Sequence, residues 1–465
     1  MDLITMQTLQ TDFIQEPARS VPVVKQTDVL VVGGGPAGIM AARAAAESGL
    51  SVSLVESRGF LGGNLTIGLP VLGFLDQRGR PIIAGLPQQF MDRLRRRGAA
   101  SEHRPCPLHI SLTLVDAEAV KAVALELLLE KGVDIRLHTF FASPILDGER
   151  VCGILTESKA GREAIRARVV VDCTGDADVA YRAGVPCEKG DARGGLQPPT
   201  LMFAMNGVDT EKLRLSLSRQ PKNYVADIIP PEYFGRNRQY IVVGLRRLIA
   251  QARDQGLDLP TERVIVITGL RPGEVWVNMT RVKGVDGTDP RSLTHGEIEA
   301  RRQIETLVKF LVQYVPGFEN SQFTRTAPFL GIRETRRIVG RYVLTREDIL
   351  GCRRFEDAIA VGSYPVDLHR PHDNDCTLEY CGDSYDLPYR ALVPQRVSHL
   401  LVAGRCISTT HEAMAAIRVM STCMALGEAA GRAAALAVRE GVGPGEIDVA
   451  VLRAELRRRG AYLNG

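Results

Sequence analysis

The order of apolar and polar positions from residue 27 onward predicts alternating strands and helices. Residues 27–32 (TDVLVV) form a run of β-branched and aliphatic side chains that is typical of a buried strand. Residues 39–48 are rich in alanine and favour a helix that ends at Gly49, and residues 52–55 are a second apolar strand. A strand, a glycine-rich turn, a helix and a strand in this order indicate one βαβ unit of a parallel sheet.

The same pattern continues beyond this unit. Residues 116–131 form an amphipathic helix, and strands are expected at 134–139 and 168–172. Between these strands, residues 145–157 (ILDGERVCGILTE) have the pattern of a β-hairpin. These elements extend the predicted α/β architecture.

The character of the sequence changes after residue 200. Two alternating segments, RVIVITG and EVWVNMTRV, precede a long helical stretch at 295–314. After Gly331 the strands and helices return, and they end in an apolar strand (HLLVAGRCIS) and a helix of small residues at 422–439. We therefore predict that a second domain is inserted into the first.

The predicted fold is α/β, with a doubly wound, Rossmann-like nucleotide-binding domain of the glutathione-reductase-like type and an inserted α+β substrate domain. The predicted limits are an N-terminal extension at 1–26, a discontinuous nucleotide-binding domain at 27–200 and 326–440, the substrate domain at 201–325, and a C-terminal tail or helix at 441–465.

Composition narrows the class of protein. The 465 residues are enough for two packed domains, and 45% hydrophobic with 24% charged residues is typical of a globular protein. A net charge of +4 gives no electrostatic reason to expect nucleic acid as a partner. Arginine-rich runs at 94–98 and 456–460 favour a solvated surface, with salt bridges in a homo-oligomer as the alternative.

Three further features predict a cytoplasmic location. Nine scattered cysteines without a CxxC pair favour reduced thiols. The first 26 residues contain acidic side chains and no apolar run, so we expect no signal peptide. No uncharged apolar segment reaches the roughly 18 residues that a membrane span needs, so no membrane insertion is expected.

The glycine-rich turn after the first strand has the spacing GxGxxG, filled by Gly33, Gly35 and Gly38. The first glycine permits a tight turn, the second lets the backbone approach a pyrophosphate, and the third lets the helix pack on the strand. The N-terminus of the helix that follows the turn favours the anionic phosphates. These features together predict a dinucleotide site.

Glu56 and the later glycines distinguish between cofactors. Glu56 ends the second strand 18 residues after Gly38, where a carboxylate accepts hydrogen bonds from a ribose diol and disfavours a 2′-phosphate. Glycines also follow Glu56 in SRGFLGGN, lie in VVVDCTGDADVA, and lie in LLVAGRCIS. Three separated glycine-bearing strand ends imply a long dinucleotide, and FAD is favoured over NAD.

The motif segments carry a resemblance to a known family. GFLGGN, VDCTGDADVA, GGLQPPTLMF, GIRETRRIVGRYVLTREDIL and HLLVAGRCISTTHEAMAAIRVMSTCMALGEAAGRAAA resemble the bacterial FAD-dependent oxidoreductase family, which is related in fold to flavoproteins of the fumarate reductase and thiazole synthase type. The resemblance spans roughly residues 16–440 and says little about the substrate. It implies FAD, with the isoalloxazine ring near residues 411–427.

The predicted FAD contacts combine the motif positions with this resemblance. They are Gly33, Gly35, Pro36, Ala37, Gly38, Glu56, Ser57, Gly62, Gly63, Asn64, Thr174, Gly175, Asp176, Gly404, Arg405, Met420 and Thr422.

Two departures from the wider flavoprotein pattern bear on the cofactor. Many relatives carry Gly-Asp at the third glycine site, whereas this chain has Gly404 and Arg405, so an arginine interaction with pyrophosphate is expected there. The pattern HTxxAxGG, in which a histidine binds flavin covalently, is absent before Gly62. We therefore expect noncovalent FAD.

The route of the electrons follows from what the sequence lacks. There is no second GxGxxG unit for a nicotinamide cofactor and no CxxC for a redox disulfide. The simplest scheme is hydride transfer from a small-molecule substrate to flavin N5, with an unidentified acceptor that reoxidises the flavin. Reduction of an activated double bond uses the same geometry in reverse.

Candidate catalytic residues are histidines and an arginine. Oxidation of a hydroxyl needs a base, and His369 and His411 are the candidates, with a scaffold role as the alternative for each. Arg333, in GIRETRRIVG, is a candidate to bind a substrate carboxylate, with interior pairing to Glu334 as the alternative.

The segment HRPHDNDCTLEYCGD contains several potential metal ligands. Its His-x2-His-x3-Cys-x4-Cys spacing matches no common zinc site, so no metal is expected, and a loop that covers the substrate is preferred.

The function favoured by the sequence is dehydrogenation of a small polar molecule, an alcohol or a sugar derivative, by an FAD-dependent oxidoreductase. One alternative is reduction of an activated alkene. The other is a thiazole-synthase-like or non-catalytic dinucleotide-binding protein, which would require a nucleophilic cysteine such as Cys173 or Cys406 beside the nucleotide.

Overall fold

The computed structural model describes residues 14–219 and 229–464. Its principal element is a sheet in the order β6-β2-β1-β9-β8-β7, with β21 also paired to β9. The strands are β1 (Val23–Val32), β2 (Val52–Val55), β6 (Asp134–Arg136), β7 (Phe140–Asp147), β8 (Arg150–Ser158), β9 (Gly161–Asp172) and β21 (Leu400–Val402). The pairs β1–β2, β1–β9, β2–β6 and β9–β21 are parallel, while β7 and β8 form the predicted antiparallel hairpin. The predicted α/β class is thereby confirmed.

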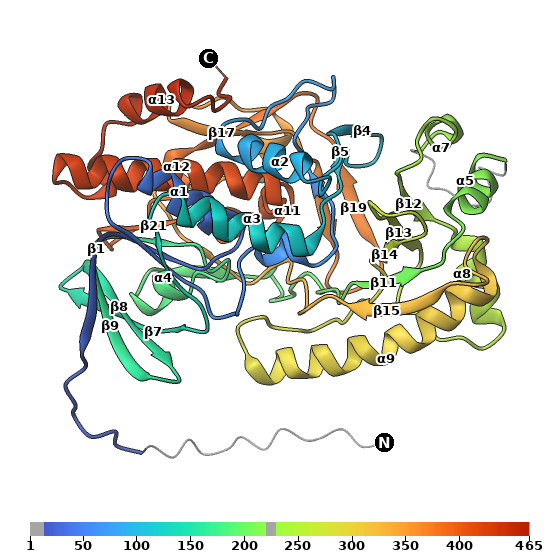
Figure 1. Ribbon diagram of the computed structural model, residues 1–465, viewed down its shortest axis with the longest axis horizontal. Helices are drawn as coiled ribbons and strands as arrows, with labels where there is room; N and C mark the ends of the chain where they lie inside the picture. The colour runs from blue at the N-terminus through green and yellow to red at the C-terminus, as the bar shows by residue number, and fades with distance from the viewer. Residues whose placement is uncertain (1–13, 220–228, 465) are drawn as a thin grey trace.

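Helices cover this sheet and close the core (Figure 1). They are α1 (Pro36–Ala46), α2 (Leu86–Arg96), α3 (Ala117–Leu129), α4 (Asp178–Arg182), α10 (Arg346–Leu350), α11 (His411–Ile417), α12 (Met420–Glu440) and α13 (Val449–Arg458), with short 3-10 turns η1 (Gly63–Thr66), η2 (Tyr389–Ala391) and η3 (Pro444–Glu446). Figure 1 shows α1, α3 and α12 above one face of the sheet.

The small residues of α12 are explained by its packing on α1. A Cβ atom added at Gly427 would lie 2.1 Å from the carbonyl oxygen of Ala37, and one at Gly431 would lie 2.2 Å from that of Ala41. Backbone therefore meets backbone along this face, which larger side chains would separate. The close packing places the N-terminus of α12 beside the glycine-rich turn.

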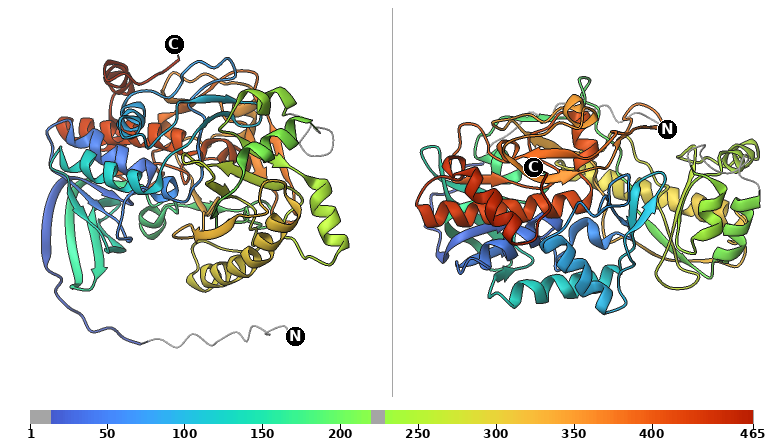
Figure 2. Two further views of the ribbon diagram at one scale, coloured as in Figure 1. Left: turned by 45° about the vertical axis from the view of Figure 1, so that its right-hand side comes forward. Right: turned by 90° about the horizontal axis from the view of Figure 1, so that it is seen from above.

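The segment between β10 and β16 forms a second, antiparallel sheet in the order β12-β13-β14-β11-β15. Its elements are β11 (Phe203–Asn206), α5 (Thr210–Arg219), α7 (Pro231–Arg236), β12 (Ile241–Gly244), α8 (Arg246–Asp254), β13 (Val264–Thr268), β14 (Val275–Val277), α9 (Pro290–Tyr314) and β15 (Gln322–Thr326). In both views of Figure 2, this green-to-yellow segment lies at one side of the molecule. The predicted domain limits stay a prediction.

The remaining strands form smaller sheets. They are the three-stranded set β3 (Val71–Leu72), β5 (Ile110–Thr113) and β4 (Arg104–Cys106), and the pairs β10 (Cys187–Lys189) with β16 (Arg336–Ile338), β17 (Ala358–Gly362) with β20 (Tyr385–Pro388), and β18 (Val366–His369) with β19 (Cys376–Glu379).

Some predicted elements differ from the structure at their ends. The strand predicted from residue 27 begins at Val23, because β1 and β9 pair from Val23 and Ala164 onward. The strand predicted at 168–172 begins at Gly161 for the same reason, since its first half pairs with β8. Pairing partners distant in sequence therefore extend both strands.

Within the described residues, no single helix has the length and apolar character to cross a membrane. The consecutive helices α11 and α12 meet those two criteria only as a pair, and they are bent by 92° relative to each other.

Candidate functional site

The glycine-rich turn joins β1 to α1 at the carboxyl end of the parallel strands. Gly33 has φ +101°, and a Cβ atom there would lie 2.5 Å from the carbonyl oxygen of Cys173. A Cβ atom at Gly38 would lie 1.8 Å from the carbonyl oxygen of Gly33. A Cβ atom at Gly35 would meet nothing within 4 Å, so the Gly35 backbone borders open space. The turn thus leaves room for a ligand at the position where a pyrophosphate is expected.

Glu56 is held at the end of β2 by the backbone around it. Its side chain is buried, Oε2 accepts a 2.7 Å hydrogen bond from Gly34 N–H, and Oε1 accepts one of 2.8 Å from Arg58 N–H. The Ser57 hydroxyl donates to the same oxygen over 3.0 Å. The carboxylate is therefore fixed beside the turn, where it is available to a ribose.

These residues border a cavity of about 290 Å³, called here the nucleotide cavity. The predicted FAD contacts that line it are Gly33, Gly35, Pro36, Ala37, Glu56, Gly63, Asn64, Thr174, Gly175, Asp176, Gly404, Arg405 and Met420. The carboxyl ends of four parallel strands and the start of α12 thus meet around one space.

Four predicted contacts lie outside that lining: Gly38, Ser57, Gly62 and Thr422. Gly38 packs on the turn, and Ser57 supports Glu56. Gly62 has φ +120° and makes the bend into η1. Thr422 is buried within α12. They support the cavity from behind.

Several lining residues were missed by sequence reasoning. Arg58 lies with its guanidinium carbon 3.8 Å from the ring centroid of Phe329. Glu297 of α9 and Cys423 of α12 also border the nucleotide cavity. Arg58 lies two residues after Glu56 in the sequence, which is the one local signal that could have indicated it.

Arg405, at the third glycine site, forms an ion pair with Asp176. Its Nη1 donates to the carbonyl oxygen of Ile332 over 2.8 Å. Burial alone would lower the pKa of Arg405, but Asp176 raises it. The buried Nε atoms of Arg405 and Arg418 have no hydrogen-bond partner among the described residues. These donors fit an anionic or oxygen-rich cofactor, and with Glu56 and the glycine turn they satisfy the requirements of FAD.

A second cavity of about 360 Å³, called here the substrate cavity, adjoins the first. Its apolar lining includes Ile241, Val243 and Ile265 from strands β12 and β13 of the second sheet. Its polar wall includes His109, Arg333, Tyr364, Asp367, His369 and Arg418. The residues that border both cavities are Asn64, Ile332, Arg405, Arg418 and Met420.

The hairpin β18–β19 supplies Asp367 and His369 to the substrate cavity. They are two positions apart on one strand and so share a face. Asp367 accepts a 3.0 Å hydrogen bond from the Tyr364 hydroxyl, and its Oδ1 lies 3.6 Å from His369 Nε2. Burial alone would raise the pKa of Asp367, but His369 and Arg418 hold it below its ordinary range.

Both ring nitrogens of His369 have a neighbour. Besides Nε2 beside Asp367, Nδ1 lies 3.4 Å from Nη1 of Arg281. Burial, with Arg333 close by, lowers the pKa of His369 to about 3. The imidazole is therefore neutral at physiological pH, and Nδ1 is positioned to accept from the arginine.

His109 is a candidate that sequence reasoning missed. Its carbonyl oxygen accepts a 2.6 Å hydrogen bond from Ser111 N–H, and the residue between them, Ile110, has φ +63°. A positive φ at a β-branched residue in a γ-turn is strained by about 1–3 kcal/mol. The turn presents His109 to the substrate cavity, where its ring is stacked on Tyr364.

Among the described residues, the ring nitrogens of His109 have fewer polar neighbours than those of His369. Among the described residues, the one hydrogen-bond contact of its ring is from Nδ1 to Cys106 Sγ at 4.0 Å. Burial lowers the pKa of His109, so its ring is neutral and able to accept a proton. No glycine or motif marks this position in the sequence.

Arg333 lies in the substrate cavity as the sequence suggested, whereas His411 does not. Arg333 Nη1 donates to Pro198 O over 2.5 Å and to Thr200 Oγ1 over 2.8 Å. His411 is buried, and its Nδ1 lies 2.8 Å from Oε1 of Glu334. That placement favours the scaffold role for His411.

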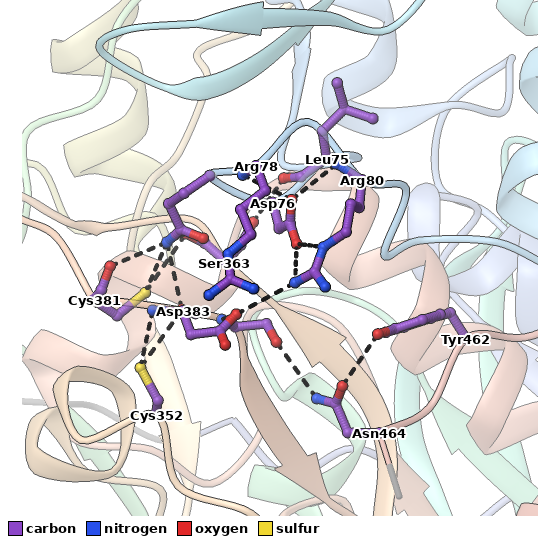
Figure 3. A network of polar contacts seen from close by, with 12 residues as sticks. Leu75, Asp76, Arg78, Arg80, Cys352, Ser363, Cys381, Asp383, Tyr462 and Asn464 are labelled. Atoms are coloured by element: carbon purple, nitrogen blue, oxygen red, sulfur yellow. Dashed lines mark hydrogen bonds and ion pairs between the residues drawn. The ribbon is translucent and has the colours of Figure 1, made fainter.

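A polar network anchors the base of the β18–β19 hairpin (Figure 3). The Ser363 hydroxyl, before the hairpin, donates to Leu75 O over 2.8 Å. Gln77 Nε2 donates to the carbonyl oxygen of Cys381, after the hairpin, over 3.1 Å. Asp76 receives the backbone N–H of Arg80 over 2.8 Å and so holds the loop that carries Gln77. The loop therefore fastens both ends of the strand pair that carries Asp367 and His369.

The chain is similar to a known family and to two curated proteins. A model of the family described as FAD dependent oxidoreductase matches residues 28–456. A digeranylgeranylglycerophospholipid reductase from Methanoculleus marisnigri is 31% identical over 34% of this chain and 41% of its own. A thiamine thiazole synthase from Aeropyrum pernix is 29% identical over 34% of this chain and 57% of its own. The chain thus spans about half the length of these curated relatives.

A solved structure also matches at low identity. The p-nitrophenol 4-monooxygenase from Pseudomonas putida DLL-E4 is 15% identical, with a TM-score of 0.46, over 93% of this chain and 84% of its own.

Proposed function

The chain belongs to the FAD-dependent oxidoreductase family, and we propose that it oxidises a small organic molecule bound in the substrate cavity, with FAD held in the nucleotide cavity. The observation that carries this proposal is the shared border of the two cavities. A group that extends from the glycine turn past Asn64 and Met420 reaches the wall of the substrate cavity. A ligand in the larger space would then be next to the redox-active end of the cofactor.

The residues that would hold FAD divide by chemistry. Glu56 suits the ribose hydroxyls, and the backbone of Gly33–Gly35 with the N-terminus of α1 suits the pyrophosphate. Arg405 would donate its Nε–H group, which has no partner among the described residues, to a cofactor oxygen. When bound, FAD supplies a flavin ring that accepts a hydride from the substrate. We keep noncovalent binding as part of the proposal.

We assign the proton-accepting role to His109 in preference to His369. A base needs a ring nitrogen that faces the substrate, and His109 is stacked at the cavity wall with one long contact to Cys106. The nitrogens of His369 face Arg281 and Asp367, which suits a residue that positions the polar wall. His411 is assigned to the scaffold because its ring pairs with buried Glu334.

Reduction of an activated alkene is the second candidate function. The apolar wall of the substrate cavity favours it, since Ile241, Val243 and Ile265 would pack against a hydrocarbon. The relative from Methanoculleus marisnigri is described as a reductase. Hydride transfer to and from the flavin uses the same chemistry. The direction of the reaction is therefore set by the identity of the electron donor and of the electron acceptor.

A thiazole-synthase-like role is disfavoured by the cysteines. Cys173 borders the nucleotide cavity, but burial and the nearby Asp172 raise its pKa well above the ordinary value for a thiol. Cys406 is fully buried, and burial raises its pKa as well. A thiol acts as a nucleophile in its ionised form, and neither site favours ionisation.

Anaerobic flavin reduction tests the proposal. The FAD-loaded protein is mixed with alcohols, sugars and organic acids, and loss of the visible flavin absorption is followed. Bleaching by one class of donor is expected. Protein that binds no FAD, or whose FAD is bleached by no donor but reoxidised by alkenes after chemical reduction, would contradict oxidation and favour the reductase.

A further inference from the structure

The arginines of the substrate cavity are not all balanced by acids. Buried arginines elsewhere in the protein pair with carboxylates: Arg337 with Glu334, and Arg432 with Glu47. Arg333, by contrast, has no carboxylate within 4.0 Å among the described residues. Its described partners are two neutral oxygens, on Pro198 and Thr200, and the side-chain amide oxygen of Asn278 at 3.5 Å.

Arg418 adds to the same surplus of positive charge. Its Nη2 donates to the backbone oxygen of Asp367 over 2.8 Å, while the carboxylate of that residue is 3.8 Å away. The Nε atom of Arg418 is buried without a hydrogen-bond partner among the described residues. This donor belongs to a side chain that borders both cavities.

The charges that line the substrate cavity can be compared directly. Arg263 is paired with Asp375, and Arg405 is paired with Asp176. Of the other charged residues on this lining, Arg333 and Arg418 are positive, and Asp367 is the one carboxylate. That carboxylate already accepts from the Tyr364 hydroxyl. The lining therefore carries an excess of positive charge, which burial makes costly without a counter-ion.

The lining also contains apolar side chains. Ile241, Val243 and Ile265 come from β12 and β13 of the inserted sheet, and Leu378 comes from β19. A ligand that fills the cavity therefore meets both guanidinium groups and hydrocarbon. A sugar, with hydroxyl groups over its whole surface, would leave donors unpaired against these apolar side chains.

We propose that the substrate is an organic acid with a hydrocarbon body, whose carboxylate pairs with Arg333 and Arg418. This inference rests on the proposed function, because it names the substrate class of the same cavity. The planar guanidinium fork matches a carboxylate with two parallel hydrogen bonds. Burial, with Arg418 and Arg281 nearby, lowers the pKa of Arg333 to about 9, and a bound anion would offset that destabilisation.

Binding of a matched pair of probes to the FAD-loaded protein tests the inference without catalysis. Hexanoate and hexanamide have the same shape and differ in charge, and calorimetry gives the affinity of each. We expect hexanoate to bind at least about tenfold more tightly, since hydrogen bonds to charged groups are the stronger ones. Equal affinities would overturn the proposal, as would tight binding of hexylphosphonate with none of hexanoate.

Variants locate the effect. R333Q should lower hexanoate affinity by about 10- to 100-fold and leave hexanamide unchanged. R418Q should act in the same direction, which provides a second test if R333Q fails to fold. R302Q, at an exposed position of α9, should preserve the preference for hexanoate. An unchanged preference in folded R333Q and R418Q would refute the assignment.

The two proposals can fail separately. If no donor reduces the flavin but hexanoate still binds through Arg333, the proposed oxidation is wrong and the anion site stands. If neutral alcohols reduce the flavin and hexanoate does not bind, the proposed oxidation stands and the proposal of an organic-acid substrate is wrong.

Discussion

The ring of His109 stacks on the ring of Tyr364, with centroids 6.1 Å apart and planes inclined by 5°. The two residues belong to different parts of the chain, yet both line the substrate cavity. The Tyr364 hydroxyl is directed to Asp367, so its ring fixes His109 while its oxygen fixes the carboxylate. This arrangement, with the strained turn at Ile110, gives His109 a defined position.

Replacement of His109 by glutamine should slow flavin reduction by about 10²- to 10⁴-fold, the range typical of a lost general base. H369Q should slow it less, because both ring nitrogens of His369 are already engaged. Burial lowers the pKa of His109, and the proton-accepting form exists above that pKa. The wild-type rate should therefore be constant at neutral and alkaline pH and fall only below about 6.5, the ordinary histidine value.

Stopped-flow measurement of anaerobic flavin reduction gives these rates once a donor is known. A larger loss in H369Q than in H109Q, with unchanged FAD binding in both, would reverse the assignment of roles.

Substitution of Gly35 should separate cofactor binding from folding. Gly35 has φ −77°, which alanine adopts, and a Cβ atom there meets no protein atom within 4 Å. We expect G35A to keep the stability of the FAD-free protein within about 0.5 kcal/mol. Its FAD affinity should fall at least about tenfold, because the methyl group occupies the space beside the pyrophosphate.

Fluorescence titration with FAD measures the affinity, and urea unfolding measures the stability. G235A is the matched control, since a Cβ atom at Gly235 also meets nothing within 4 Å but lies in α7. FAD binding of wild-type strength in G35A would exclude the turn as the pyrophosphate site.

Part of the nucleotide cavity was predictable because its residues are local in sequence. Gly33, Gly35 and Glu56 belong to one βαβ unit, whose spacing determines its geometry. Thr422 was predicted with Met420 from the same segment, yet Cys423 lines the cavity in its place. Met420 and Cys423 are three residues apart on α12 and share a face, so the side chain of Thr422 points away from that face.

The substrate cavity was predictable only in part. His369 and Arg333 were singled out, but the partners that define their chemistry come from distant segments, such as Arg281 and Pro198. His109 was missed because its role depends on the backbone conformation of Ile110 and on stacking against Tyr364. No sequence period encodes a contact of that kind.

The hairpin anchor in Figure 3 makes a prediction about positioning. Q77A should destabilise the protein by about 1–2 kcal/mol, since it removes the hydrogen bonds to Cys381 and leaves that buried carbonyl oxygen unpaired. Amide hydrogen exchange in β18 and β19 should accelerate, while FAD affinity stays unchanged because Gln77 does not line the nucleotide cavity.

Hydrogen exchange by mass spectrometry, with Q251A at an exposed position of α8 as control, tests this anchor. Unchanged exchange across 366–379 in Q77A would show that the hairpin is held by other contacts.

Glu428 of α12 predicts an unusual dependence of stability on pH. Its Oε2 accepts a 3.0 Å hydrogen bond from Leu86 N–H, whereas Oε1 is buried without a hydrogen-bond partner among the described residues. Burial raises the pKa of Glu428 to about 7, above the value of the unfolded chain. The folded state therefore binds a proton that the unfolded state releases, and this contribution to stability is lost as pH rises from about 4.5 through 7.

Replacement by glutamine removes that titration while it keeps the shape of the side chain. E428Q should be more stable than the wild type by about 3 kcal/mol at pH 8 and by less than about 1 kcal/mol at pH 5, because each unit of pKa shift is worth about 1.4 kcal/mol. Urea unfolding of the FAD-free protein at the two pH values measures the difference. E440Q, at the exposed end of the same helix, should show no such change. An equal difference in stability between E428Q and the wild type at both pH values would contradict the prediction. It would show that Glu428 does not change its protonation state between pH 5 and pH 8.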